Sequence, residues 1–134
     1  MMNHHGIVHF EVPANDPEKL VNFYTQLFGW EVDKMDMEGM PYWSIRTGPV
    51  DPTTMMPKEP GYIGGGIAKR MSPDQGPVNY VNVEDVDQYV QKAQGMGAKL
   101  AAPKMPVPGM GYFAHLVDPE GNTFGVWQND MAAK

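Results

Sequence analysis

The chain has 134 residues, of which 42 % are hydrophobic and 19 % charged, a composition typical of one ordinary globular domain. It has no cysteine, which excludes disulfides, thiolate catalysis and cysteine-based zinc sites. The net charge is −6 and the Lys and Arg residues are scattered, whereas a nucleic-acid surface needs concentrated positive charge. No apolar run approaches the roughly 18 residues of a membrane span, and the polar start lacks the pattern of a signal peptide. We therefore expect a cytoplasmic protein that binds neither nucleic acid nor membrane.

The first half of the chain predicts a strand, a helix and three further strands. Residues 6–12 are rich in β-branched and aromatic side chains, which favour a strand. Asp16 is a good N-cap for the helix, Pro17 suits its first turn, and Gly29 is placed to end it. The apolar positions of this helix recur at helical spacing and are Leu20, Phe23, Tyr24 and Leu27. Three more strands are predicted at 30–36, 42–47 and 62–69, with a turn at Glu38-Gly39 and a proline-rich loop at 48–61.

The second half predicts the same order again. A strand at 77–83 leads to a helix that begins after Asp85 and ends at Gly97. The apolar positions of this helix are Val86, Tyr89, Val90, Ala93 and Met96. Strands follow at 98–102, 112–117 and 122–128, separated by a proline-rich loop at 103–109 and a tight turn at 118–121.

The helix signals of the two halves keep the same register. Asp16 and Asp85 lie 69 positions apart, and Gly29 and Gly97 lie 68 positions apart. A unit of this size cannot bury both a helix face and a sheet alone, so two copies are expected to pack together. The sequence therefore predicts one α+β domain over 1–134, made of two βαβββ modules at about 6–70 and 76–128.

Short motifs at matching places in the two halves carry a resemblance to a known family. In the first half they are His9-Phe10-Glu11-Val12, Asp16-Pro17-Glu18 and Leu27-Phe28-Gly29-Trp30. In the second half they are Val83-Glu84-Asp85-Val86, Gly95-Met96-Gly97-Ala98 and Asp118-Pro119-Glu120-Gly121-Asn122. With these motifs the chain resembles the vicinal oxygen chelate superfamily of glyoxalases, bleomycin-resistance proteins and extradiol dioxygenases. The resemblance implies a curled-sheet, glyoxalase-like domain with a cavity lined by the first and last strands of each module, and a homodimer.

Metal-dependent members of this superfamily take one ligand from the first and the last strand of each module. Carried over to this chain, the first-strand positions fall on His9 and Val78. The last-strand positions fall on Gly125 and within Gly64–Gly66. Since only His9 has a donor atom, the resemblance implies a protein without a metal or other cofactor. A non-family metal site made of His9, Glu11 and His115 is the alternative.

Strand alternation indicates which side chains share the predicted cavity. His9 and Glu11 lie two residues apart and therefore face one side of their strand. By the family's parity, the other side chains expected there are Tyr80, Asn82, Phe113, His115 and Trp127. Trp43 is a further candidate for stacking on a flat ligand.

Three functions remain open at this point. The missing metal ligands favour a binding protein of the bleomycin-resistance type for a small apolar or aromatic molecule. The second is a lyase, isomerase or dioxygenase-like enzyme related to glyoxalase I, for which His9, His115 and Glu11 are the catalytic candidates. The third is a structural or regulatory module, with the loops 48–61 and 103–111 as the expected places for a lid or a partner contact.

Overall fold

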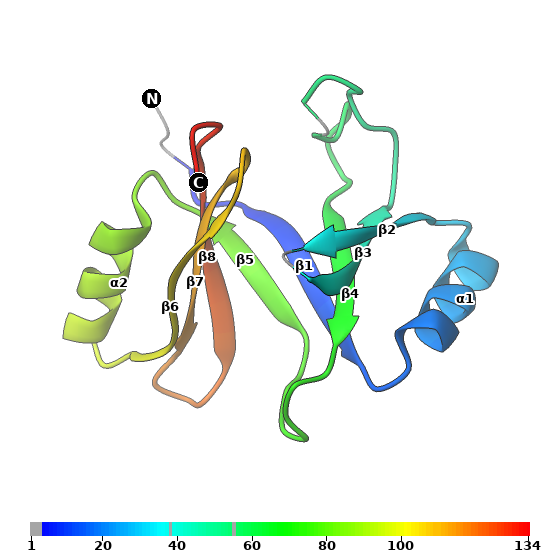
Figure 1. Ribbon diagram of the computed structural model, residues 1–134. Helices are drawn as coiled ribbons and strands as arrows, with labels where there is room; N and C mark the ends of the chain where they lie inside the picture. Colours follow the sequence, from blue (N-terminus) through cyan, green and yellow to red (C-terminus); the bar gives the residue numbers. More distant parts are fainter. Residues whose placement is uncertain (1–3, 38, 55) are drawn as a thin grey trace. The chain divides into compact units, whose positions relative to one another are not determined.

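The computed structural model describes residues 4–37, 39–54 and 56–134 (Figure 1). Its elements are, in order, β1 (Ile7–Ala14), α1 (Pro17–Phe28), β2 (Glu31–Met37), β3 (Met40–Arg46), β4 (Gly64–Lys69), β5 (Val78–Asn82), α2 (Val86–Gly95), β6 (Lys99–Val107), β7 (Gly111–Val117) and β8 (Thr123–Asn129). The order strand, helix and three strands occurs twice, which confirms the predicted α+β fold with two βαβββ modules. Glu38 of the predicted turn lies outside the described residues. Within the described part of the chain, neither helix is long and apolar enough to cross a membrane.

The chain divides into two compact units. Module one is His9–Pro77, and module two is Val78–Lys134 together with the residues up to Val8. The strand order is β2-β3-β4-β1 in module one and β5-β8-β7-β6 in module two. The first and last strands of each module pair in parallel, and the other pairs are antiparallel. Strands β1, β4 and β3 therefore correspond to β5, β8 and β7.

Helix α1 begins and ends as its sequence predicts. The Asp16 carboxylate accepts a hydrogen bond from the Lys19 amide at 3.2 Å, and Gly29 adopts a φ of 71° that closes the last turn. The helix covers one face of the module one sheet (Figure 1). The buried centre of this core consists of Ala14, Trp43, Ile45 and Ile67, with Leu20 and Tyr24 of the helix packed against it.

The predicted apolar stripe of α1 is partly wrong. Phe23 and Leu27 are 55 % and 57 % exposed, whereas Leu20, Val21 and Tyr24 face the core. The Tyr24 ring stacks on Trp30 at 5.3 Å, and this pair supplies the large apolar surface that the prediction assigned to Phe23 and Leu27.

Helix α2 repeats the arrangement on the module two sheet. The Asp85 carboxylate accepts from the Gln88 amide at 3.2 Å, and Gly97 follows the helix end with a φ of 105°. The buried centre of this core consists of Val83, Val86, Ala114, Leu116 and Val126. The predicted helix positions Tyr89, Val90 and Ala93 pack against it. Met96 does not, since it is 72 % exposed.

The prediction of a proline-rich loop at 103–109 is also wrong. Strand β6 continues to Val107 and includes Pro103 and Pro106. It is the last strand in its module's order, with β7 on one side, and its pairing shifts register between Leu100 and Met105. An edge position and irregular pairing accommodate residues that lack a backbone N–H. In module one, the predicted loop between β3 and β4 is present.

Candidate functional site

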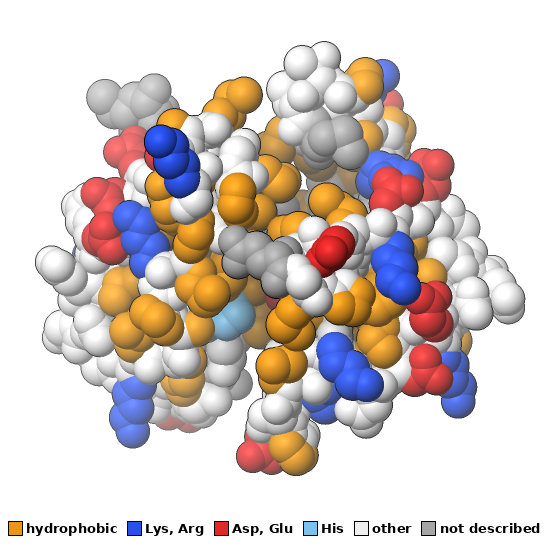
Figure 2. Space-filling view, in the orientation of Figure 1, with side chains coloured by type: hydrophobic (Ala, Val, Ile, Leu, Met, Phe, Trp, Pro, Cys, Tyr) orange, Lys and Arg blue, Asp and Glu red, His pale blue; other side chains and the backbone are white. Residues whose placement is uncertain are grey.

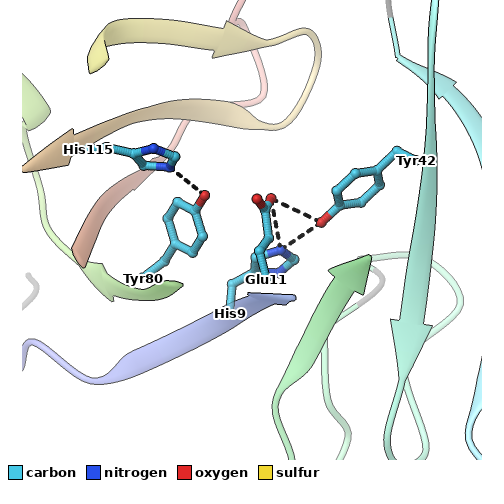
Figure 3. A network of polar contacts seen from close by, with 5 residues as sticks. All are labelled: His9, Glu11, Tyr42, Tyr80 and His115. Carbon is cyan, nitrogen blue, oxygen red and sulfur yellow. Dashed lines mark hydrogen bonds and ion pairs between the residues drawn. The ribbon is translucent and has the colours of Figure 1, made fainter. Parts of the chain in front are cut away.

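A polar cluster of His9, Glu11 and Tyr42 lies on the module one sheet (Figure 3). Its face is opposite α1, because these residues alternate with Phe10 and Trp43 of the core that packs against that helix. The His9 Nε2 and Tyr42 hydroxyl atoms are 2.9 Å apart. The same hydroxyl donates to Glu11 Oε2 at 3.2 Å, and His9 Nε2 lies 3.7 Å from that oxygen. The side chains of His9 and Glu11 are 33 % and 30 % exposed, so both are half-buried. The expectation that His9 and Glu11 share one face is confirmed, and Tyr42 joins them from β3.

The glycines of β4 make this cluster possible. A Cβ atom added at Gly66 would lie 1.8 Å from the Tyr42 hydroxyl oxygen. Gly65 lies on the other face of β4, toward the core. A Cβ atom added there would lie 2.4 Å from the Phe10 ring. Real side chains cannot approach this closely. The glycine run therefore leaves space that neighbouring aromatic side chains fill from both faces.

Module two has a matching pair on the face opposite α2. The Tyr80 hydroxyl and His115 Nε2 lie 2.6 Å apart (Figure 3). The Phe113 ring adds to this pair, with its centre 6.2 Å from Tyr80 and 5.4 Å from His115. Tyr80, Phe113 and His115 therefore form an aromatic group that includes one hydrogen-bonded histidine.

A glycine again lies beneath the tyrosine. Tyr80 and His115 are both direct strand neighbours of Gly125. A Cβ atom at Gly125 would lie 2.3 Å from Tyr80 Cδ2. Tyr80 itself is only 3 % exposed, so it supports His115 and Phe113 more than it offers a surface of its own.

The other predicted side chains divide between the two faces. Asn82 and Phe113 are direct strand neighbours of Trp127, which places all three on the face of Tyr80 and His115. The Asn82 Oδ1 atom is buried without a hydrogen-bond partner. Trp43 is a correction, since it is 5 % exposed within the core under α1. It alternates with Tyr42 along β3, so the hydrophobic core takes Trp43 and the polar face takes Tyr42.

Sequence reasoning missed Tyr42. Two signals could have found it. Its position alternates with the core residues Trp43 and Ile45, and a glycine run in a strand indicates close approach by a neighbouring group. The exposed His5 ring bonds to the Asn82 carbonyl at 2.9 Å and the Tyr89 hydroxyl at 3.1 Å.

The metal positions implied by the resemblance do not fit a metal within either module. At Gly66 and Gly125, a ligand side chain would overlap Tyr42 or Tyr80. His9 and Glu11 provide two donors on module one, and a tightly held divalent ion needs more. The described residues contain no group of three or more His, Asp or Glu side chains placed to hold a metal ion.

Two cations outside the cluster, one in each module, pair with a carboxylate. Arg46 on β3 bonds to Asp33 on β2, and this hydrogen bond raises the pKa of the guanidinium. Lys104 on β6 bonds to Asp87 at 2.9 Å, which raises the pKa of the Lys104 ammonium. On the face shown in Figure 2, the Lys and Arg side chains are interleaved with Asp and Glu over the described residues.

Comparison with known proteins places this chain in a family. The family described as Glyoxalase/Bleomycin resistance protein/Dioxygenase superfamily matches residues 6–126. The chain belongs to this superfamily. A glyoxylase-like domain-containing protein of Didymella fabae is 26 % identical over 129 residues, which cover 94 % of this chain and 95 % of that protein. CFP32 of Mycobacterium bovis, a proposed glyoxylase, is 28 % identical over 120 residues, or 88 % of this chain and 43 % of its own length.

Solved structures agree on the superfamily fold. A methylmalonyl-CoA epimerase variant of Streptomyces coelicolor, in complex with 2-nitronate-propionyl-CoA, aligns with a TM-score of 0.67. The alignment covers 98 % of this chain and 99 % of the epimerase at 14 % identity. Likeness at this identity establishes the shared glyoxalase-like fold, and function has to be argued from the residues of the site.

Proposed function

We propose that this superfamily member binds small molecules without a metal ion, at the sheet face that lies opposite the helix within a module. The observation that carries the proposal is the filling of Gly66 and Gly125 by Tyr42 and Tyr80. A metal-dependent relative would need a ligand side chain at these two positions. Here a tyrosine fills the space instead, and its hydroxyl bonds to a histidine.

The composition of the two faces supports a ligand with an apolar or aromatic body and a polar group. Phe113 and Trp127 provide ring surface in module two, and His115 provides a polar atom beside them. His9 and Glu11 provide half-buried polar atoms in module one. Apolar walls with a few convergent polar groups are typical of small-molecule sites.

A screen of small apolar and aromatic compounds by ligand-observed NMR, with EDTA present throughout, tests the proposal. We expect binders whose affinity falls about 2- to 10-fold in Phe113→Ala, because an aromatic contact contributes about 0.5–1.5 kcal/mol beyond its area. Phe23→Ala is the matched control, since Phe23 is an exposed ring on α1. A broad library without a binder, or binding that EDTA abolishes, would contradict the proposal.

The bonded chain from His9 through Tyr42 to Glu11 favours a second candidate, a metal-independent lyase or isomerase that moves a proton. The glyoxylase-like relative and the epimerase neighbour support an enzyme of this kind. The test is deuterium uptake from D₂O at the carbon beside a carbonyl group in a bound ligand. Uptake that is equal in wild type and His9→Ala would argue against this candidate.

A further inference from the structure

The two arginines of the chain have different kinds of partner. Arg46 bonds to the Asp33 carboxylate, as described above. Arg70, which directly follows β4, bonds only to neutral oxygens: the Asn15 side chain at 3.1 Å, the Pro13 carbonyl at 3.4 Å and the Gln75 carbonyl. Arginine stays positively charged in proteins. Within the part of the chain that the structure describes, no carboxylate pairs with Arg70, so its charge is not neutralised by the protein.

An open hollow of about 450 Å³ lies beside this guanidinium. Its lining residues are Asn15, Arg70, Met71, Ser72 and Pro73. All of them belong to module one, at the end where β1 and β4 pair, and none belongs to the polar cluster described above. The Arg70 amide donates to the Ala14 carbonyl at 2.8 Å, which continues this pairing past the strand ends. Its volume is within the range of about 300–1,000 Å³ typical of small-molecule sites.

The polar lining groups offer hydrogen-bond donors to this hollow. A guanidinium has five N–H hydrogens, and Arg70 uses three of them. Asn15 Oδ1 accepts from Arg70, so both hydrogens on Asn15 Nδ2 remain. Ser72 Oγ accepts from the Asp74 amide at 3.4 Å, so its own hydrogen remains too. None of these hydrogens has an acceptor among residues 4–37, 39–54 and 56–134.

Lys69 adds a second positive charge at the same place. Its Nζ atom donates to the Asn15 carbonyl at 3.0 Å, and none of the ion pairs of the described residues includes it. Donors and positive charge without a carboxylate in the lining are the conditions that favour an anion, since charge-assisted hydrogen bonds to an oxyanion are stronger than neutral ones.

We propose that this hollow is an oxyanion site, which binds the carboxylate or phosphate group of a small molecule through Arg70, Asn15 and Ser72. Met71 and Pro73 provide apolar surface for the carbon atoms next to that group. The site is additional to the sheet face that carries the proposed function. Its test uses simple anions, so the failure of one proposal leaves the other standing.

Two carboxylates flank the lining residues in the sequence. The Asp16 carboxylate accepts from the Lys19 amide as the cap of α1. Asp74 is exposed. Neither residue lines the hollow. Both lower the positive potential around Arg70, so we expect weak binding that falls further as the salt concentration rises.

The arginine side chains report binding directly. In ¹⁵N-labelled full chain, Arg46 and Arg70 each give an Nε–H signal, and the Arg70 signal is the one that remains in Arg46→Lys. Inorganic phosphate and acetate are titrated separately, with sodium chloride holding the ionic strength constant. We expect a saturable shift of the Arg70 signal with at least one of them, while the Arg46 signal stays in place. The anion that binds more tightly identifies the preferred group.

Asn15→Asp is the decisive variant. It keeps an oxygen that can accept from Arg70, but it places a carboxylate in the lining and removes the Nδ2 donors. We expect the affinity for the bound anion to fall about 10-fold or more. Asn22→Asp is the matched control, since it makes the same change of charge at an exposed position of α1. Ser72→Ala, at an exposed serine, should weaken binding about 2- to 10-fold and serves if Asn15→Asp fails to fold.

The absence of a saturable Arg70 shift with both anions would overturn the proposal. A shift of equal size at Arg46 would do the same, because it would report general screening by ions. An affinity that Asn15→Asp leaves unchanged, or that Asn22→Asp lowers equally, would also overturn it.

Discussion

Module one and module two use the same scaffold to present different chemistry. In both, a glycine on the last strand lies under a tyrosine that bonds to a histidine. The partners are exchanged: the first strand supplies His9 in module one and Tyr80 in module two, and the third strand supplies Tyr42 and His115. A duplicated fold therefore preserves the space that a glycine leaves, while the residues that fill it change.

The two glycines also differ in how tightly they are covered. At Gly66 a new Cβ would meet the hydroxyl end of Tyr42, which can swing away from a half-buried position. At Gly125 it would meet the body of the Tyr80 ring, which is 3 % exposed and has little room to move. Module two is thus expected to be the more rigid of the two.

The largest expected effect is on the stability of Gly125→Ala. Overpacking against the buried Tyr80 ring should lower the free energy of unfolding by about 1–3 kcal/mol. Gly66→Ala should cost less than about 1 kcal/mol, since the Tyr42 hydroxyl can move aside. Urea unfolding of both variants measures the difference. An equal loss of unfolding free energy in the two variants would contradict the expected difference, because it would mean that both glycines are covered equally tightly.

A smaller effect is expected when each tyrosine loses its hydroxyl. Tyr80→Phe removes a hydrogen bond of a buried side chain and should cost about 0.5–1.5 kcal/mol. Tyr42→Phe should cost less, because the half-buried His9 and Glu11 can bind water in its place. Thermal unfolding of the two variants side by side checks the order. A larger loss of stability in Tyr42→Phe than in Tyr80→Phe would contradict the expected order.

The smallest effect concerns the β7–β8 turn of module two. The pKa of Asp118 lies below its ordinary value, chiefly because the Asn122 amide donates to the carboxylate, with the Glu120 amide adding to it. A carboxyl whose folded-state pKa is lowered contributes stability above its unfolded pKa of about 3.9, and that contribution is lost as the pH falls through the folded pKa.

Asp118→Asn should therefore be less stable than wild type at neutral pH, and the gap should narrow as the pH falls below about 4. Urea midpoints measured between neutral and acid pH give this gap directly. A gap that stays constant over the acid range would show that the charge on Asp118 has no part in the turn.

Local signals in the sequence predicted the scaffold well. The caps Asp16 and Asp85 and the terminal Gly29 form their helix ends because each depends on one residue and its nearest neighbours. Alternation placed His9 with Glu11 for the same reason. The path of β6 through Pro103 and Pro106 was missed because tolerance of proline depends on which strand lies at the sheet edge.

The candidate site was predicted only in part, because its decisive contacts are non-local. Tyr42 reaches His9 across β4, and its place there depends on the pairing register and on the missing side chain at Gly66. Trp43 was assigned to the ligand because aromatic rings suit both cores and binding faces. Helix α1 packs over Trp43 and Ile45 of β3, so Trp43 belongs to the core. Composition alone does not show which face of a strand a helix will cover.

Binding without a metal is the central claim, and a Mn²⁺ titration of chelator-treated protein, followed on the His9 and His115 imidazole signals, tests it most directly. Paramagnetic Mn²⁺ broadens the signals of nuclei close to it, so a bound ion reports its own location. We predict that neither imidazole broadens selectively as Mn²⁺ reaches one equivalent. Saturable broadening of the His9 signals, complete near one equivalent, would contradict the account.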